Sequence, residues 1–131
     1  MTDTRTAVLA AANALVAAFG RHDSKAYFDA FAPEATFVFY NLDRTLANRA
    51  EYEAEWALWE RRDGFKVTAC RSTERSVQVL GDVAIFTHRV ETEVSLGGEA
   101  MINHERETIV FARQADGRWL AVHEHLSALP A

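Results

Sequence analysis

The feature that most constrains the fold is a change of pattern at Gly64. The chain after this glycine consists of runs rich in β-branched and aromatic residues, which are typical of strands. Short glycine-containing turns of the kind that close hairpins separate the runs. We therefore predict four antiparallel strands paired in sequence order, over about residues 65–79, 82–95, 99–113 and 118–127.

The half of the chain before Gly64 has helical spacing instead. Apolar residues recur every three or four positions from Val8 to Phe19, which predicts an amphipathic helix over about residues 3–19. A short second helix is expected to begin at Asp23 or Ser24 and to be stopped by Pro33.

A short strand is then expected over residues 35–40, followed by a third helix. Asn48, with Glu51 three residues later, resembles a capping box that opens this helix, and the pattern continues to about Arg62. Helices first and long strands afterwards predict an α+β fold with the helices on one face of a curved sheet. We expect a single domain over residues 1–131, with a cavity between the two layers as the default site.

Composition excludes several classes of partner. The net charge is −5, and the basic residues are scattered, so nucleic acid and anionic membrane surfaces are not expected partners. The single cysteine, Cys70, excludes an internal disulfide and is expected to act as a small buried side chain. The apolar N-terminal run is interrupted by Asn13 and lacks a basic start, so we expect a cytoplasmic protein without a signal peptide.

The third helix carries an aromatic stripe. Tyr52, Trp56 and Trp59 stand at positions i, i+4 and i+7, so they share one helix face. Packing against a sheet is one explanation of the stripe. The other is that one ring, foremost that of Trp56, forms the wall of a pocket for an apolar ligand.

The last strand has ionisable groups on both faces. Strict alternation places Trp119, Ala121, His123, His125 and Ser127 on one face and Leu120, Val122, Glu124 and Leu126 on the other. One face should therefore meet a cavity, and the other should meet solvent or a partner. His123 and His125, with His104, form a conceivable metal-binding set, but no Cys or Asp ligand is in step and we predict no metal.

The order of these elements resembles the nuclear transport factor 2-like superfamily. The closing run Asp116-Gly117-Arg118-Trp119-Leu120-Ala121-Val122-His123-Glu124-His125-Leu126-Ser127, with Arg106 and Thr108 on the preceding strand, resembles the SnoaL-like branch. The ending is also similar to the association (hub) domain of calcium/calmodulin-dependent protein kinase II. The resemblance implies a cone-shaped α+β barrel, also described as cystatin-like, and a homodimer formed through the sheet. It does not imply one activity.

The resemblance suggests two chemistries, and the residues of this chain can be compared with what each requires. Ketosteroid isomerisation is disfavoured, because the first strand lacks a carboxylate in Phe37–Tyr40 and no tyrosine paired with a neutral carboxylic acid is evident. A dehydratase of the scytalone type needs histidine and tyrosine in the cavity. Four histidines, with Tyr27 or Tyr40, are available for acid–base work near neutral pH: His88, His104, His123 and His125.

The hub resemblance selects a cavity face. A cavity arginine of the hub matches Arg89, which implies that Thr87, Arg89, Glu91, Asn103, Glu105, Glu107, Val122 and Glu124 face inward. Two other hub arginines match Ile109 and Leu126, so a carboxylate ligand is not expected. We predict catalytic roles for Arg89, Glu107 and Glu124, and ligand-binding roles for Tyr27, Phe39, Trp56, Trp59, Asn103 and His125. The charged residues are alternatively a structural ion-pair network.

Two functions follow as hypotheses. The first is a small homodimeric protein that binds a small organic molecule and, if it is an enzyme, performs acid–base isomerisation, dehydration or cyclisation without a cofactor. The second is a dimerisation or ligand-sensing module without catalysis. They are to be distinguished by whether Arg89 and Glu124 converge on an open cavity or are tied together and sealed.

Overall fold

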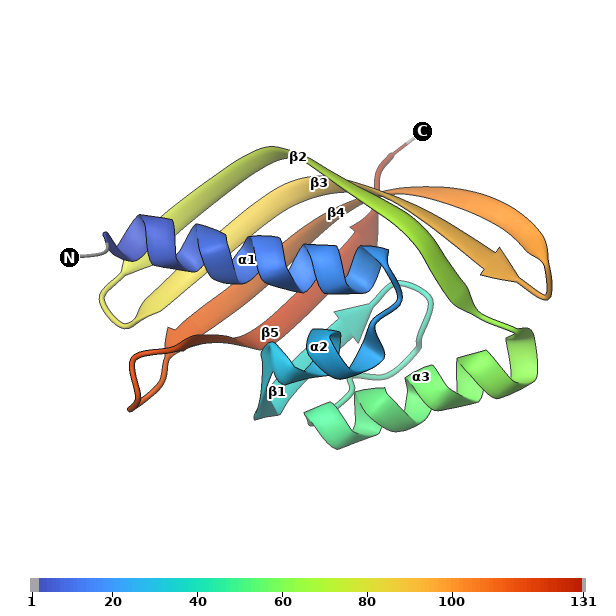
Figure 1. Cartoon of the computed structure of the whole chain (residues 1–131), viewed down its shortest axis with the longest axis horizontal. Helices are drawn as coiled ribbons and strands as arrows, with labels where there is room; N and C mark the ends of the chain where they lie inside the picture. The colour runs from blue at the N-terminus through green and yellow to red at the C-terminus, as the bar shows by residue number, and fades with distance from the viewer. Residues whose placement is uncertain (1–2, 131) are drawn as a thin grey trace.

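The computed structural model describes residues 3–130 and has the predicted α+β architecture, with helices packed on one side of a curved five-stranded sheet (Figure 1). No helix in this range is long and apolar enough to cross a membrane. The elements in chain order are α1 (Thr4–Gly20), α2 (Ser24–Asp29), β1 (Phe31–Phe39), α3 (Arg49–Asp63), β2 (Lys66–Leu80), β3 (Val83–Leu96), β4 (Glu99–Arg113) and β5 (Trp119–Ala128).

The strand order in the sheet is β1-β5-β4-β3-β2. The four C-terminal strands pair antiparallel in sequence order, which confirms the hairpin prediction. At one edge β1 pairs parallel with β5, a long-range contact that the sequence pattern did not predict. The last strand therefore lies inside the sheet, with a neighbour on each side.

The first strand is longer than expected. It begins at Phe31, so Pro33 lies within β1 and does not end a helix, because α2 already stops at Asp29. Proline cannot donate to a strand ladder and is tolerated at sheet edges. The pairing of β1 with β5 is accordingly irregular between Phe31 and Thr36.

Helix α1 lies along the sheet (Figure 1). Its buried residues Val8, Ala12, Leu15 and Ala18 follow the predicted helical spacing. At its end the backbone comes so close to β2 that a Cβ on Gly20 would lie 3.2 Å from Cβ of Cys70. The absence of a side chain at Gly20 permits this contact.

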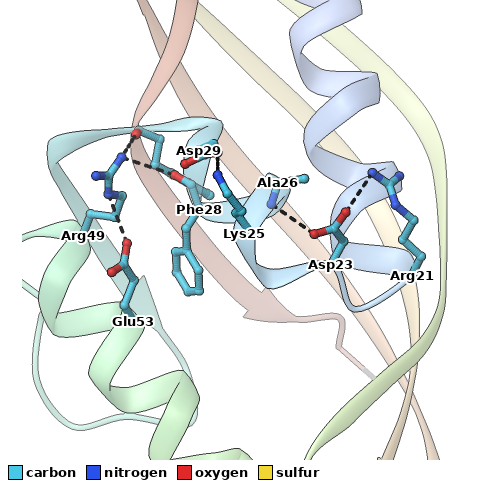
Figure 2. Close-up of polar contacts among 9 residues, drawn as sticks. Arg21, Asp23, Lys25, Ala26, Phe28, Asp29, Arg49 and Glu53 are labelled. Carbon is cyan, nitrogen blue, oxygen red and sulfur yellow. Dashed lines mark hydrogen bonds and ion pairs between the residues drawn. The ribbon is translucent and has the colours of Figure 1, made fainter.

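Polar contacts hold the other two helices together (Figure 2). Asp23 caps α2 by accepting a hydrogen bond from the backbone N–H of Ala26 at 3.2 Å. Arg49, at the start of α3, donates to the backbone oxygen of Phe31 at 2.8 Å and pairs with Glu53 at 3.2 Å. Arg49 also donates to the backbone oxygen of Phe28 in α2 at 3.5 Å, and the ring of Phe28 packs edge to face on that of Tyr52 in α3.

Both ends of α3 agree with the sequence prediction. Asn48 accepts a hydrogen bond from the backbone N–H of Glu51 at 2.9 Å, as a capping residue should. At the other end Gly64 has the left-handed φ of +63°, and a Cβ there would lie 3.0 Å from the backbone nitrogen of Gly97. The turn between β3 and β4 thus touches the end of α3.

Candidate functional site

A cavity of about 300 Å³ lies between the helices and the inner face of the sheet. This volume is at the lower end of the range for ligand pockets. Most of its wall is aromatic or aliphatic, and its polar groups come mainly from β4 and β5. The lining residues are Leu15, Val16, Phe19, Tyr27, Phe39, Tyr40, Asn41, Tyr52, Trp59, Phe65, Cys70, Val90, Thr92, Val94, Asn103, Glu105, Glu107, Glu124 and Leu126.

Strand alternation on β4 supplies two of the carboxyl groups. Asn103, Glu105 and Glu107 are two residues apart, so their side chains share one face of the strand. All three line the cavity, in agreement with the predicted inward face. This part of the face assignment is confirmed.

A bulge in β5 supplies the third carboxyl group. Phe111 of β4 lies opposite Ala121, but the preceding Val110 lies opposite His123, so Val122 has no partner on β4. An extra residue of this kind reverses the alternation beyond it. Ala121 before the bulge and Glu124 after it are consequently both buried, and strict alternation along β5, which put them on opposite faces, is wrong.

Glu107 is held by a histidine on the neighbouring strand. Its Oε1 lies 2.7 Å from Nε2 of His88, and Nδ1 of His88 lies 2.6 Å from the hydroxyl oxygen of Ser72. Burial, together with the positive charge of Arg75, lowers the pKa of His88 to about 4. The imidazole is therefore neutral near pH 7. When Glu107 is ionised it can only accept, so Nε2–H donates to Glu107 and Nδ1 accepts from Ser72.

Glu124 accepts a hydrogen bond from one tyrosine of the helical layer, and a second tyrosine contacts the first. The hydroxyl of Tyr27 donates to Oε1 of Glu124 at 3.2 Å, and the hydroxyl oxygens of Tyr27 and Tyr52 are 2.9 Å apart. All three residues are buried. Burial, followed by the nearby charge of Glu124, raises the pKa of both phenols well above the ordinary value, so both stay protonated donors.

Glu107 and Glu124 line the same cavity and each affects the pKa of the other, so we call them the carboxyl pair. Burial raises the pKa of Glu107 to about 7. Burial and then the charge of Glu107 raise the pKa of Glu124 well above its ordinary value. Burial thus favours the neutral form of each carboxyl group, and the ionisation of one makes the ionisation of the other less favourable.

The carboxyl group of Glu105 accepts hydrogen bonds from neutral donors of its own. Its Oε2 accepts from the hydroxyl of Tyr40 at 2.6 Å, and its Oε1 accepts from the hydroxyl of Thr92 at 3.0 Å. Tyr40 is half-exposed at the edge of the cavity, whereas Glu105 is buried. The wall of the cavity thus carries three acidic side chains. Two of them, Glu105 and Glu124, accept hydrogen bonds from hydroxyl groups.

The inward placement predicted for Arg89 is wrong. On β3 the buried residues are Ala84, Phe86, His88, Val90, Thr92 and Val94, so Arg89 points to the opposite face together with Thr87 and Glu91. Its side chain is 57% exposed and forms an ion pair with Glu74 at 2.5 Å. Arg89 and Glu124 therefore neither converge on the cavity nor form a sealed pair.

Two predicted ligand-binding residues also lie outside the cavity. His125 is exposed on the outer face of β5, because the bulge turns Glu124 and Leu126 inward. Trp56 is 2% exposed and packs in the core among other aromatic rings. Its ring centroid lies 5.0 Å from that of Phe65. Trp59 lines the cavity instead. The core explanation of the stripe therefore holds for Trp56.

The structure brings together Tyr27, Phe39, Trp59, Asn103, Glu107 and Glu124 of the predicted site residues. It adds His88, which the hub alignment had placed on the outer face, and the hydroxyl groups of Tyr52 and Thr92. The sequence of β3 could have indicated that His88 faces inward, because the residues that share its face are more apolar than those on the other face. The statement that no tyrosine is paired with a neutral carboxylic acid is also wrong, because Tyr27 contacts Glu124.

The outer-face histidines do not form a metal centre. Nδ1 of His123 lies 2.8 Å from the hydroxyl oxygen of Thr36, and His104 lies near Glu91, at 3.9 Å. Within residues 3–130 no group of three His, Cys, Asp or Glu side chains is placed to hold a metal ion.

The curved sheet, its helical layer and the enclosed cavity define the nuclear transport factor 2-like fold class. A protein of this class from Cytophaga hutchinsonii has a TM-score of 0.81 and 14% identity to this chain, over 98% of this chain and 100% of the other. The chain itself belongs to the SnoaL-like domain family, whose model matches residues 8–131. Comparison with curated protein sequences finds no match.

Two further solved structures share the fold. A ketosteroid isomerase-like protein from Erwinia carotovora atroseptica has a TM-score of 0.82 and 19% identity, and the match covers 100% of both chains. A protein from Xanthomonas campestris, assigned as a calcium/calmodulin-dependent protein kinase II association domain, has a TM-score of 0.80 and 21% identity over 98% of this chain and 90% of the other. At such identities the similarity shows the fold alone.

Proposed function

We propose that this SnoaL-like protein binds a small organic molecule in the cavity and performs acid–base isomerisation, dehydration or cyclisation on it without a cofactor. The observation that carries the proposal is the carboxyl pair, Glu107 and Glu124, which lines the cavity with a raised pKa. A general acid or base works best when its pKa is near the operating pH. Glu107, at about 7, meets this requirement.

The hydrogen-bond directions assign a role to each group. Tyr27 donates to Glu124, and His88 donates to Glu107, so donors converge on the pair from both sides. In this arrangement the ionised Glu107 accepts a proton from the bound molecule, and the protonated Glu124 returns one. Tyr27 donates to Glu124 and accepts from Tyr52, and in this way the two tyrosines keep Glu124 in place.

The test is proton exchange, which requires no knowledge of the product. Small apolar carbonyl compounds are incubated with the protein in D₂O, and loss of the α-hydrogen signal is followed by NMR. We expect exchange above the buffer rate for at least one compound. Glu107→Gln and Glu124→Gln should each reduce that rate by about a hundredfold, the usual contribution of a general acid or base.

Glu99→Gln is the matched control, because Glu99 is an exposed glutamate at the far end of the same strand. It should leave exchange unchanged, and all variants should retain the circular dichroism spectrum of the wild type. The proposal is contradicted if no compound exchanges above the buffer rate, or if both carboxyl-pair variants exchange as fast as the wild type.

The same proposal includes a homodimer of one-domain subunits, 1–131, in the cytoplasm. The dimer would form through the outer face of the sheet, where the exposed Arg106 lies directly opposite Arg89. Like charges that face each other are unfavourable without acidic groups nearby. Arg89 pairs with Glu74 of the same chain, and an acidic group of the partner subunit would do the same for Arg106. Sedimentation should show twice the subunit mass, with Arg106→Glu shifting the protein toward the monomer, and a monomeric wild type would contradict the dimer.

A dimerisation or ligand-sensing module without catalysis is the second candidate. It is favoured by the similarity to the Xanthomonas campestris protein assigned as a kinase association domain. A dimer that binds small molecules but shows no proton exchange with any compound would support this function over the first.

A further inference from the structure

The cavity is acidic and contains no basic side chain. Three of its lining residues are glutamates, and none is a lysine, an arginine or a histidine. The nearest base, His88, contacts Glu107 and is neutral near pH 7, because burial lowers its pKa to about 4. Nothing in the wall therefore balances the negative charge of the carboxyl groups.

Glu105 is the clearest case of an unbalanced carboxyl group. It is 5% exposed, and its two hydrogen bonds come from the neutral hydroxyl groups of Tyr40 and Thr92. Within residues 3–130 no basic side chain forms an ion pair with it. A carboxylate has about four acceptor positions, so Glu105 can still accept further hydrogen bonds from a bound molecule.

The acidic groups that line the cavity determine which ligand charge is favourable. Three carboxyl groups, those of Glu105, Glu107 and Glu124, line the cavity, and no basic side chain is among its lining residues. Burying negative charge without a counter-charge is unfavourable, and a cationic ligand would relieve this, whereas an anionic ligand would add to it.

The remaining wall is suited to an organic cation. The rings of Tyr27, Tyr52, Trp59 and Phe65 line the cavity, and aromatic faces attract ammonium groups as well as hydrocarbon. Glu105 and Glu107 are two residues apart on β4, which separates their Cα atoms by about 7 Å. Both side chains line the cavity, so both carboxyl groups are open to an ammonium donor on a bound molecule.

We propose that the molecule bound in this cavity is a small organic amine in its ammonium form, held between Glu105 and Glu107 with its hydrocarbon part against the aromatic wall. The proposal rests on the proposed function, because it takes the same cavity as the binding site. It adds the chemical class of the substrate.

Three probes of nearly equal size and different charge test the proposal: benzylamine, benzyl alcohol and benzoate. Each is titrated into the wild-type protein at pH 7 by calorimetry. Benzylamine should bind at least about tenfold more tightly than benzyl alcohol, since a charge-assisted hydrogen bond is worth about that factor. Benzoate should not bind.

Variants then locate the ammonium group. Glu105→Gln should weaken benzylamine by about tenfold and leave benzyl alcohol within about twofold. Glu99→Gln, on the same strand but exposed, should change neither affinity. If Glu105→Gln does not fold, the comparison of the three probes on the wild type still decides the question.

Equal or tighter binding of benzyl alcohol or benzoate overturns the amine proposal, as does the absence of binding by all three probes. Loss of amine affinity in Glu99→Gln to the same extent as in Glu105→Gln also overturns it. None of these results decides the acid–base function, which depends on proton exchange in the Glu107 and Glu124 variants.

Discussion

Nε2 of His88 lies 2.7 Å from Oε1 of Glu107, and both side chains belong to the inner face of the sheet. Burial acts on the two groups in opposite directions, since it lowers the pKa of His88 and raises that of Glu107. Both shifts favour the neutral form. The pair therefore makes the stability of the protein depend on pH.

The contribution of Glu107 to the free energy of unfolding should fall as the pH rises from about 4.5 to about 7. Glu107 has a pKa of about 7 in the folded protein and 4.5 ordinarily, so the folded state binds more protons in this window. Its stabilising contribution is complete below the ordinary pKa and is lost as the pH passes the raised one, with a change on the order of 3 kcal/mol. His88 acts in the opposite direction: its pKa falls from 6.5 to about 4 on folding, so the unfolded state binds more protons between these values, and its contribution rises with pH and offsets much of that of Glu107.

Urea unfolding at a series of pH values measures this slope. Glu107→Gln should remove the falling contribution, because the amide does not titrate, so the slope should become more positive than that of the wild type. An identical slope in wild type and Glu107→Gln would contradict the raised pKa of Glu107.

The two stripe tryptophans should separate stability from binding. Trp56 is buried in an aromatic cluster with Phe19, Tyr27 and Phe65, so Trp56→Ala should reduce the free energy of unfolding by about 3–5 kcal/mol. Trp59 is only partly buried and lines the cavity, so Trp59→Ala should cost less stability and weaken ligand binding. Thermal melts and calorimetry measure the two effects, and a larger loss of stability in Trp59→Ala would contradict this assignment.

Two glycines with nearly equal backbone angles should respond differently to alanine. Gly64 and Gly81 have φ values of +63° and +66°, but an added Cβ at Gly81 meets nothing within 4 Å, whereas at Gly64 it meets Gly97 at 3.0 Å. Gly81→Ala should cost about 1 kcal/mol from the left-handed backbone alone. Gly64→Ala should cost more in chemical unfolding, and equal losses would show that α3 and the β3–β4 turn do not constrain each other.

Substitution of Arg89 tests whether the outer face of the sheet takes part in the chemistry. Its exposed ion pair with Glu74 lies away from the cavity, so Arg89→Ala should change stability by less than about 1 kcal/mol. It should also leave proton exchange unchanged. A loss of exchange comparable to that of Glu107→Gln, in a protein with the mass of the wild type, would show that the outer face takes part in the chemistry.

Several parts of the site could be read from local sequence. The helix caps, the hairpin turns and the order of elements depend on neighbouring residues, so the positions of Asn48 and Gly64 were predicted correctly. Alternation placed Glu105 and Glu107 on one face of an undisturbed strand, and the hub resemblance selected that face as the inward one. On β3 alternation defined two sets of residues, and the hub resemblance selected the wrong one, whereas the apolar character of Ala84, Phe86 and Val90 indicated the buried set.

The sequence by itself determined the succession of helices and strands and the residues available for acid–base chemistry, because these depend on contacts between near neighbours. Only the tertiary structure decided which of them meet. The unpaired Val122 brings Glu124 to the inner face beside Glu107, and the packing of α2 and α3 places Tyr27 and Tyr52 over it. Burial of these groups together then shifts their pKa values, since desolvation depends on everything that packs around a side chain and not on its place in the chain.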